Sequence, residues 1–365
     1  DNKLLIYDSD FIETGKSISY TLYIWLRYVE DPTINLASLL GTSVNAYVSV
    51  NGTDTKESTS CTFDSSKKIS YVVTFMNTDN KTVLETRKVS SGTALGNLPS
   101  TRQYFTKTGG NGTEYTSTST ITDDALVYPK LTKFELDSWT TIATNVRNGN
   151  TGDYNVGDTK EVNLGTTYGT HTLRIANTTT PSECSTSGFS QTACGFVLEF
   201  ADIITTYEMN DTDTNVGGWP ASSMYDFVNY DIYNSLPSDL KSTIIDTTVV
   251  SSHGSTNGEN FTSIDKLYLL SLKEVYSDWS TNSYSSYDSA KDLTRTLDYY
   301  INKNVTSSDD SETIKKYKTT DSWWWLREAH SNYDHSFFIV PTDDYSYLSA
   351  YANTSGGVSP AFRIG

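Results

Sequence analysis

The sequence predicts a multidomain, β-rich protein, with β-modules at the N-terminal end followed by a larger α+β domain. Its 365 residues exceed what one ordinary hydrophobic core holds and suffice for two or three domains. Serine, threonine, asparagine, aspartate, glycine and tyrosine dominate, which is typical of strands joined by polar turns. Apolar residues alternate near the N-terminus, but from Pro220 onward their spacing changes to three and four residues, which indicates helices there.

The first module is predicted at residues 1–57. Apolar side chains alternate along 18–26 and again along 44–50, just before an Asn51-Gly52 turn. These few strands are too small for a complete sandwich, so the segment is read as the C-terminal part of one. The stretch YTLYIWLRY…GTSVNAYVSVNGT resembles the ending of camelysin-like and pilin-like, Ig-like sandwich domains of Gram-positive cell surfaces.

A polar linker is predicted at 58–68, followed by a second module at 69–132. Strands are expected at 71–75 and 83–89 around a turn at 77–81. This module resembles the Listeria–Bacteroides-type repeat, a β-grasp-like stalk unit of bacterial surface proteins. The segment 101–112 departs from that pattern, because TRQYFTKTGGNG stands where an aromatic-glycine-tryptophan element is usual. The resemblance implies location at a cell surface and no chemistry.

The α+β domain is predicted at 133–365. A helix is expected after Pro220, because Met224, Phe227, Val228 and Ile232 would share one face. A second helix is expected from Pro237, with Leu240, Ile244 and Ile245 inward, and a third at 289–302. Strands are expected at 154–164, 171–175, 196–200, 266–272, 323–327, 337–340 and 358–364.

Five pieces of this domain resemble an uncharacterised bacterial surface family with a C-type-lectin-like, formylglycine-generating-enzyme-like fold. They are VGDTKEVNL, PSECSTSGFSQTACGFVLEFADIITTYEMN, the GGW segment with its helix pair, WWWLREA and GVSPAFRIG. The terminal WWLR…GVxPAFRI pair resembles the closing strands of the scaffold that diversity-generating retroelements use for hypervariable proteins. The resemblance implies a ligand-binding surface between these two motifs.

The segment 328–357 is therefore the candidate recognition surface. Tyrosine offers a large, rigid contact area with a polar tip, and asparagine and serine add adaptable hydrogen bonds. Trp323, Phe362 and their neighbours would form the supporting core, and Arg327 and Arg363 would pair with buried acids. The candidate ligand-binding residues are Glu328, His330, Asn332, Tyr333, Asp334, His335, Asp343, Asp344, Tyr345, Tyr347, Tyr351 and Asn353. The alternative is an ordinary solvated set of loops.

The cysteines, histidines and acidic runs give weaker signals. Cys184 and Cys194 lie in one polar loop and would form a disulfide in a secreted chain, or else remain two reduced thiols. Asp211, Asp213 and Asn215 form a weak Ca²⁺ candidate, although the run lacks the glycine and glutamate of a helix-loop-helix calcium loop. No other cofactor or metal is expected. The histidines not yet named also fit structural roles better than catalysis: His171 lies within a predicted strand, and His253 lies beside turn residues.

The charge balance limits the partners. With 27 lysines and arginines against 44 aspartates and glutamates, the net charge is −17. That sign repels nucleic acid and anionic lipid, and no apolar run is long enough to span a membrane. The chain opens without a signal peptide, which suggests a mature or trimmed fragment.

The preferred hypothesis is a non-enzymatic, extracellular adhesin or receptor on a cell surface. It would bind a protein or glycan on another cell, host or phage. The alternative is a structural pilus or cell-wall subunit without a dedicated ligand. An enzyme would require a deep pocket converging on His253 or His330, and no nucleophile-elbow motif is present.

Overall fold

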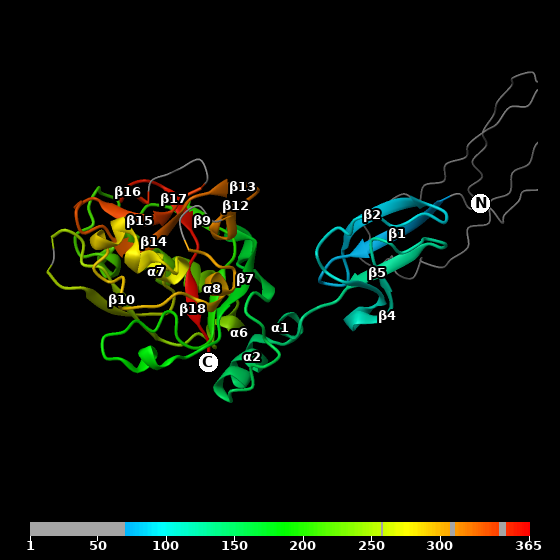
Figure 1. Cartoon of the computed structure of the whole chain (residues 1–365), viewed down its shortest axis with the longest axis horizontal. Coiled ribbons are helices and arrows are strands. Elements are labelled where there is room, and N and C mark those ends of the chain that lie inside the picture. The colour runs from blue at the N-terminus through cyan, green and yellow to red at the C-terminus, as the bar shows by residue number, and fades with distance from the viewer. Residues whose placement is uncertain (1–69, 257, 307–310, 343–347) are drawn as a thin grey trace, which may run out of the picture. The chain divides into compact units, whose positions relative to one another are not determined.

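The structure is a computed structural model that describes residues 70–256, 258–306, 311–342 and 348–365 (Figure 1). The partial sandwich predicted at 1–57 and the linker predicted at 58–68 lie outside these ranges. The described part is rich in strands arranged in several sheets, as the sequence predicts. Its buried apolar side chains form two separate clusters, one within residues 73–127 and one within residues 134–364.

The first cluster belongs to a five-stranded sheet with the order β2-β1-β5-β3-β4. Its strands are β1 (Ser70–Met76), β2 (Val83–Ser90), β3 (Tyr104–Lys107), β4 (Asn111–Tyr115) and β5 (Ala125–Pro129). β1 and β2 form the predicted antiparallel hairpin, and β1 also pairs in parallel with β5. The segment 101–112, which departs from the repeat pattern, contributes to the antiparallel β3–β4 pair.

Two helices that the sequence analysis did not predict begin the second cluster. α1 (Lys133–Leu136) follows Thr132, whose hydroxyl accepts the Glu135 N–H at 3.2 Å. The Glu135 carboxylate in turn accepts the Thr132 N–H at 2.8 Å, which completes a capping box. α2 (Trp139–Arg147) buries Ile142. The threonine-to-glutamate spacing was therefore an available helix signal.

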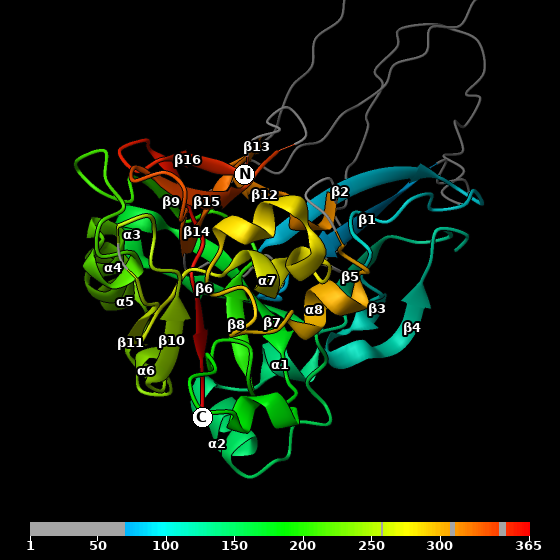
Figure 2. The ribbon, with the colours of Figure 1, turned by 60° about the vertical axis from the view of Figure 1, so that its left-hand side comes forward.

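Two larger sheets and two hairpins form the framework of this second region (Figure 2). The antiparallel sheet β18-β8-β7-β6 consists of β6 (Thr159–Asn163), β7 (Thr170–Asn177), β8 (Val197–Phe200) and β18 (Ala361–Arg363). The sheet β16-β15-β14-β17-β9 consists of β9 (Thr205–Tyr207), β14 (Trp324–Ala329), β15 (Ser336–Val340), β16 (Ser349–Tyr351) and β17 (Gly356–Val358). The hairpins are β10 (Thr247–Ser251) with β11 (Phe261–Asp265), and β12 (Lys315–Tyr317) with β13 (Thr320–Ser322).

Most predicted strands are present, with shifted ends. The strands predicted at 171–175, 196–200, 323–327 and 337–340 correspond to β7, β8, β14 and β15. The last predicted strand is divided between β17 and β18, and only 159–163 of the strand predicted at 154–164 is a strand. The strand predicted at 266–272 is wrong. Tyr268 there makes a single bridge to Ala361, because this apolar run is a buried connection between elements.

The helices are shorter than predicted. The segment after Pro220 does turn helical, through η4 (Trp219–Ala221), α4 (Ser223–Asp226), the π-helical η5 (Phe227–Ile232) and α5 (Tyr233–Ser235). The helix predicted from Pro237 is one turn, α6 (Ser238–Lys241), and Ile244 instead bridges Ile364. The third predicted helix is reduced to α8 (Asp298–Asn302). Other short helical turns are α3 (Gly165–Tyr168), η3 (Ser182–Ser185), α7 (Leu272–Val275), η6 (Trp279–Thr281) and η7 (Ser283–Tyr287). No helix in the described ranges is long and apolar enough to cross a membrane.

The tryptophan-rich motif at 323–325 and the glycine pair at 356–357 pack closely against each other. β14 runs parallel to β17, with Trp324 paired to Gly357. A Cβ atom on Gly356 would lie 2.1 Å from the Trp323 ring, and one on Gly357 would lie 2.7 Å from the Trp323 carbonyl oxygen. Only glycine permits this approach, so the two motifs require one another.

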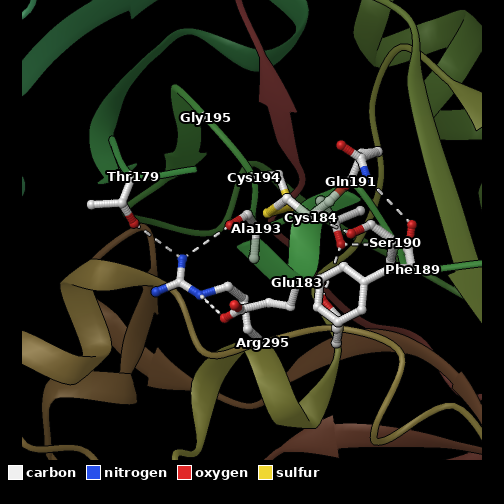
Figure 3. Close-up of a disulfide and its surroundings, with 12 residues drawn as sticks. Thr179, Glu183, Cys184, Phe189, Ser190, Gln191, Ala193, Cys194, Gly195 and Arg295 are labelled. Atoms are coloured by element: carbon white, nitrogen blue, oxygen red, sulfur yellow. Dashed lines mark hydrogen bonds and ion pairs between the residues drawn. A yellow bond between two sulfur atoms is a disulfide. The ribbon is translucent and has the colours of Figure 1, made fainter. Parts of the chain in front are cut away.

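Cys184 and Cys194 are joined by a disulfide that closes the loop between β7 and β8 (Figure 3). The loop is held at two further points. The Gln191 amide donates to the Cys184 carbonyl at 3.0 Å, and Arg295 donates to the Ala193 carbonyl at 3.1 Å. A disulfide of this kind persists in an oxidising compartment.

Replacing both cysteines with serine is expected to lower the free energy of unfolding by about 2–3 kcal/mol, because the bridge restricts the unfolded chain. Thermal unfolding with and without a reducing agent measures it. The reductant should lower the melting temperature of the wild type and leave the double serine variant unchanged. Equal melting temperatures for oxidised wild type and variant would contradict the prediction.

Candidate functional site

The described residues of the predicted recognition segment divide into an exposed group and a buried group. Asn332, Tyr333, Asp334, Tyr351 and Asn353 are exposed, and His335 is half-buried. They lie in the β14–β15 connection and at the end of β16. Asp343, Asp344, Tyr345 and Tyr347 lie outside the described residues. The segment therefore keeps a polar and aromatic surface that a partner can reach.

Glu328 and His330 do not belong to that surface, which corrects the prediction for both. Their exposed fractions are 1% and 3%. All six residues of β14 are buried, because both faces of this strand are covered, so alternation exposes no side chain there. Glu328 was expected at the surface because its side chain is charged. In the structure that side chain is buried against residues from distant segments of the chain.

Six ring side chains from three segments of the chain form a row in which each ring contacts the next. We call this row the aromatic ladder. Its members are Tyr284, Tyr287, His330, Tyr333, His335 and Tyr351. The His330 ring lies between Tyr287 and Tyr333, with centroid distances of 4.8 and 4.7 Å and interplanar angles of 23° and 29°. Tyr333 then stacks on His335 at 5.7 Å, and His335 lies 5.1 Å from Tyr351.

The ladder combines three exposed tyrosines with one buried histidine. Tyr284, Tyr333 and Tyr351 are 55%, 48% and 58% exposed, whereas His330 is buried. Burial, and then the charge of His335, lower the pKa of His330 to about 4. Its ring is therefore neutral at physiological pH and acts as a packing surface for the two tyrosines. The exposed tyrosines offer apolar ring faces and hydroxyls for hydrogen bonds, which suits recognition.

Asn215 fixes the backbone beneath the ladder. Its side-chain amide donates to the carbonyls of His330, Tyr333 and Ser336 at 3.1, 2.7 and 2.9 Å. Its backbone N–H also donates to the Asp334 carbonyl at 2.7 Å. The side chain is fully buried, so these hydrogen bonds are shielded from water. One residue from a distant loop thus shapes the whole β14–β15 connection.

The calcium candidate gains no support from these contacts. Asn215 directs its amide group at carbonyl oxygens, and Asp211 and Asp213 are exposed. Within the described ranges no group of three His, Cys, Asp or Glu side chains could hold a metal ion. The alternating acids belong to a loop whose buried member is structural.

A buried ionic cluster supports β14 from below. Arg327 makes two hydrogen bonds of 2.7 Å to the Glu274 carboxylate, and neither side chain is exposed. This confirms the predicted pairing for Arg327, whereas Arg363 forms no ion pair with the described residues. Glu328 accepts the Ser252 N–H at 2.5 Å, and Trp279 donates to Asp288 at 2.8 Å. Burial, followed by the nearby Asp288 charge, raises the pKa of Glu328 to about 8.

The other two histidines have structural contacts. His171 places Nδ1 2.8 Å from Asp202 and Nε2 2.8 Å from the Tyr168 carbonyl. Burial alone would lower the pKa of His171, but the hydrogen bond and charge of Asp202 outweigh it and raise the pKa. The His253 ring contacts the Gly254 carbonyl within its turn. Both arrangements agree with the sequence interpretation.

Sequence reasoning missed two members of the ladder, Tyr284 and Tyr287. They lie in η7, more than forty residues before Tyr333, so spacing could not join them to the recognition segment. The only signal was local: SYSSY places two tyrosines three residues apart, on one side of a 3₁₀ turn.

The fold and the ladder define a β-rich protein with a surface aromatic site on its α+β region. Residues 196–365 match the family model described as "Domain of unknown function (DUF6273)". The match begins just before β8, so β6 and β7 precede it in the sequence. No curated protein and no solved structure matches the chain.

Proposed function

We propose that this chain is an extracellular ligand-binding or adhesion protein, and that the aromatic ladder is its recognition surface for a protein or glycan. The observation that carries the proposal is the set of three exposed tyrosines in a row of contacting rings whose histidine, His330, is buried. Exposed aromatic side chains in a rigid setting are frequent binding hot spots, because little entropy is lost when they bind. In this proposal the protein binds its ligand and does not catalyse a reaction.

The surrounding structure supports display of this surface. The terminal strands β17 and β18 pair with β9, β14 and β8, so the end of the chain is part of the framework. The segment between β14 and β17 carries the exposed residues, as in the proposed C-type-lectin-like scaffold. The Cys184–Cys194 disulfide supports an oxidising, extracellular location. The sheet of β1–β5 would serve as the proposed β-grasp-like stalk.

The proposed link to a diversity-generating retroelement predicts specific features of the surrounding genes. A template repeat and a reverse transcriptase gene should lie near the coding sequence. Diversified codons should fall at exposed positions such as Asn332, Tyr333 and Tyr351, and should spare the buried Glu328 and His330.

Replacing Tyr333 and Tyr351 with alanine is expected to weaken ligand binding at least about tenfold, since each change removes an exposed ring of the ladder. The measurement is binding of labelled protein to a glycan array and to whole cells. Ile264→Ala, which removes a 59% exposed apolar side chain on β11, is the matched control and should bind as wild type. Equal binding by the double tyrosine variant and wild type would remove the ladder from the proposal.

A further inference from the structure

A pocket of about 450 Å³ lies beside β9 and the helical segment α4–η5. We propose that this pocket, which we call the β9 pocket, binds an organic cation such as an ammonium or guanidinium group. Its lining combines three aromatic rings with three carboxylates: Tyr207, Phe227, Tyr230, Asp211, Asp226 and Asp231. The proposal is independent of the ladder, because the two share no residue.

The rings provide the binding surface. Tyr207 from β9 and Phe227 from η5 are stacked, with centroids 4.1 Å apart and an interplanar angle of 8°. Tyr230 is 70% exposed, the largest exposed fraction among the exposed large hydrophobic side chains. The face of an aromatic ring attracts a cation. Because Tyr207 and Phe227 cover one face of each other, the faces that remain for a cation are their outer faces and the Tyr230 ring. An anion would be repelled by the adjacent carboxylates.

The carboxylates set the sign of the ligand. Asp211, Asp226 and Asp231 are exposed, and none of them forms an ion pair with a described lysine or arginine. These three carboxylates make the lining of the pocket negatively charged. Burial, and then the charges of Glu208, Asp211 and Asp231, raise the pKa of Tyr207. The net charge of −17 adds long-range attraction for cations.

The separation of these three carboxylates favours a large organic cation over a metal ion. They do not converge closely enough to form a metal site, since no such group of three exists in the described ranges. A bulky cation with diffuse charge can instead contact the rings while the carboxylates surround it. The π-helical turn that carries Phe227, Tyr230 and Asp231 is a rare conformation that is frequent at functional sites.

The pocket is rigidly connected to the framework. The Tyr207 carbonyl accepts the Trp325 indole N–H at 2.9 Å, and Tyr207 pairs with Gly356 of β17. Next to Asp211, the Asn210 N–H donates to the Ala352 carbonyl at 3.0 Å. The Tyr207 backbone is therefore fixed and its ring is stacked on Phe227, so this part of the pocket is formed before a ligand arrives, which limits the entropy cost of binding.

Isothermal titration calorimetry of the full chain tests the proposal with four probes. Choline chloride represents a small quaternary ammonium ligand, and N-acetyl-arginine amide and N-acetyl-lysine amide represent side chains of a partner protein. The fourth, 3,3-dimethylbutan-1-ol, is the neutral isostere of choline. At least one cation should bind, and the alcohol should bind at least about fivefold more weakly than choline if choline is the ligand. Tighter binding by choline or by an amino-acid derivative identifies the source of the cation.

Two variants locate the binding. Tyr230→Ala is expected to weaken cation binding about fivefold, and the double variant Asp226→Asn, Asp231→Asn about tenfold. Both acids are exposed, so neither change endangers the fold. Tyr284→Ala, with an exposed tyrosine in the ladder, is the matched control and should bind as wild type. The proposal is overturned if no cation binds at tens of millimolar, if choline binds and the alcohol binds equally well, or if the aspartate variant is unaffected. None of these outcomes changes the expectation for the ladder.

Discussion

Arg327→Met is expected to lower the free energy of unfolding by about 3–5 kcal/mol, because it leaves the Glu274 carboxylate buried without its partner. Both side chains are fully buried. Methionine fills similar space but supplies no donor, so the loss is electrostatic and not a cavity effect. Chemical denaturation at pH 7, followed by tryptophan fluorescence, measures the change, since Trp279 and Trp324 are buried in the same cluster.

The size of this effect follows from how many elements Arg327 joins. Besides Glu274, it donates to the carbonyl of Val250 on β10 at 3.2 Å and to that of Leu269 at 3.0 Å. Glu274 also accepts the Ser271 N–H at 3.0 Å, which completes the capping box that starts α7. The Arg327 Nε atom also lies 3.2 Å from Glu328 Oε1. Removing the arginine therefore leaves two carbonyls without these donors and two buried carboxyl groups without the guanidinium, which is costly.

Glu328→Gln is the matched control, because it changes the neighbouring buried acid by one atom. The raised pKa of about 8 means that Glu328 is largely protonated at pH 7, so glutamine removes little charge. The unfolded chain is ionised at this position at pH 7, so folding of the wild type takes up a proton. Glutamine removes that cost, and we expect the variant to be at least as stable as the wild type at pH 7. Since the folded pKa lies above the unfolded value of about 4.3, the stability that this group contributes is lost as pH rises toward and through 8. Glutamine should remove that decline. If Glu328→Gln lowered the free energy of unfolding as much as Arg327→Met does, the loss could not be attributed to the Arg327–Glu274 pair.

The strands of the framework were predictable where the apolar pattern was local. The runs around Trp324 and Phe338 are buried on both faces, and a continuous apolar run of that length predicts a strand. The same rule failed at 266–272, where LYLLSL is buried as a connection and only Tyr268 bridges a strand. Burial from both sides produces the same pattern in a strand and in a buried loop, so the sequence could not separate them.

The candidate site was predictable only in part, for a related reason. Tyr333 and Tyr351 were expected at the surface, and both are exposed. His330 was expected beside them but is enclosed by Tyr287 and Phe338, which belong to segments that no local pattern connects to it. Glu328 was misplaced because its environment depends on Asp288 and Ser252, about forty and more than seventy residues away. Exposure of a polar residue is decided by its distant neighbours.

Asn215→Asp is expected to destabilise the fold by about 3 kcal/mol and to weaken binding at the ladder. The substitution keeps the size of the side chain but replaces the donating amide by a carboxylate. That carboxylate would lie within about 3 Å of the carbonyls of His330, Tyr333 and Ser336, with no donor among them.

The negative charge of the new carboxylate, and not a change in the shape of the side chain, should cause the loss of stability in Asn215→Asp. Two measurements check this. Asn353→Asp adds the same charge at an exposed position and should change the stability by less than about 0.5 kcal/mol. In Asn215→Asp, burial would raise the pKa of the new carboxyl, so the folded state would bind a proton more readily than the unfolded chain. Its destabilisation should therefore be smaller at pH 5 than at pH 8, as denaturation at both values would measure. A loss that is independent of pH, or equal in the two variants, would show that Asn215 does not hold the ladder's backbone through its amide.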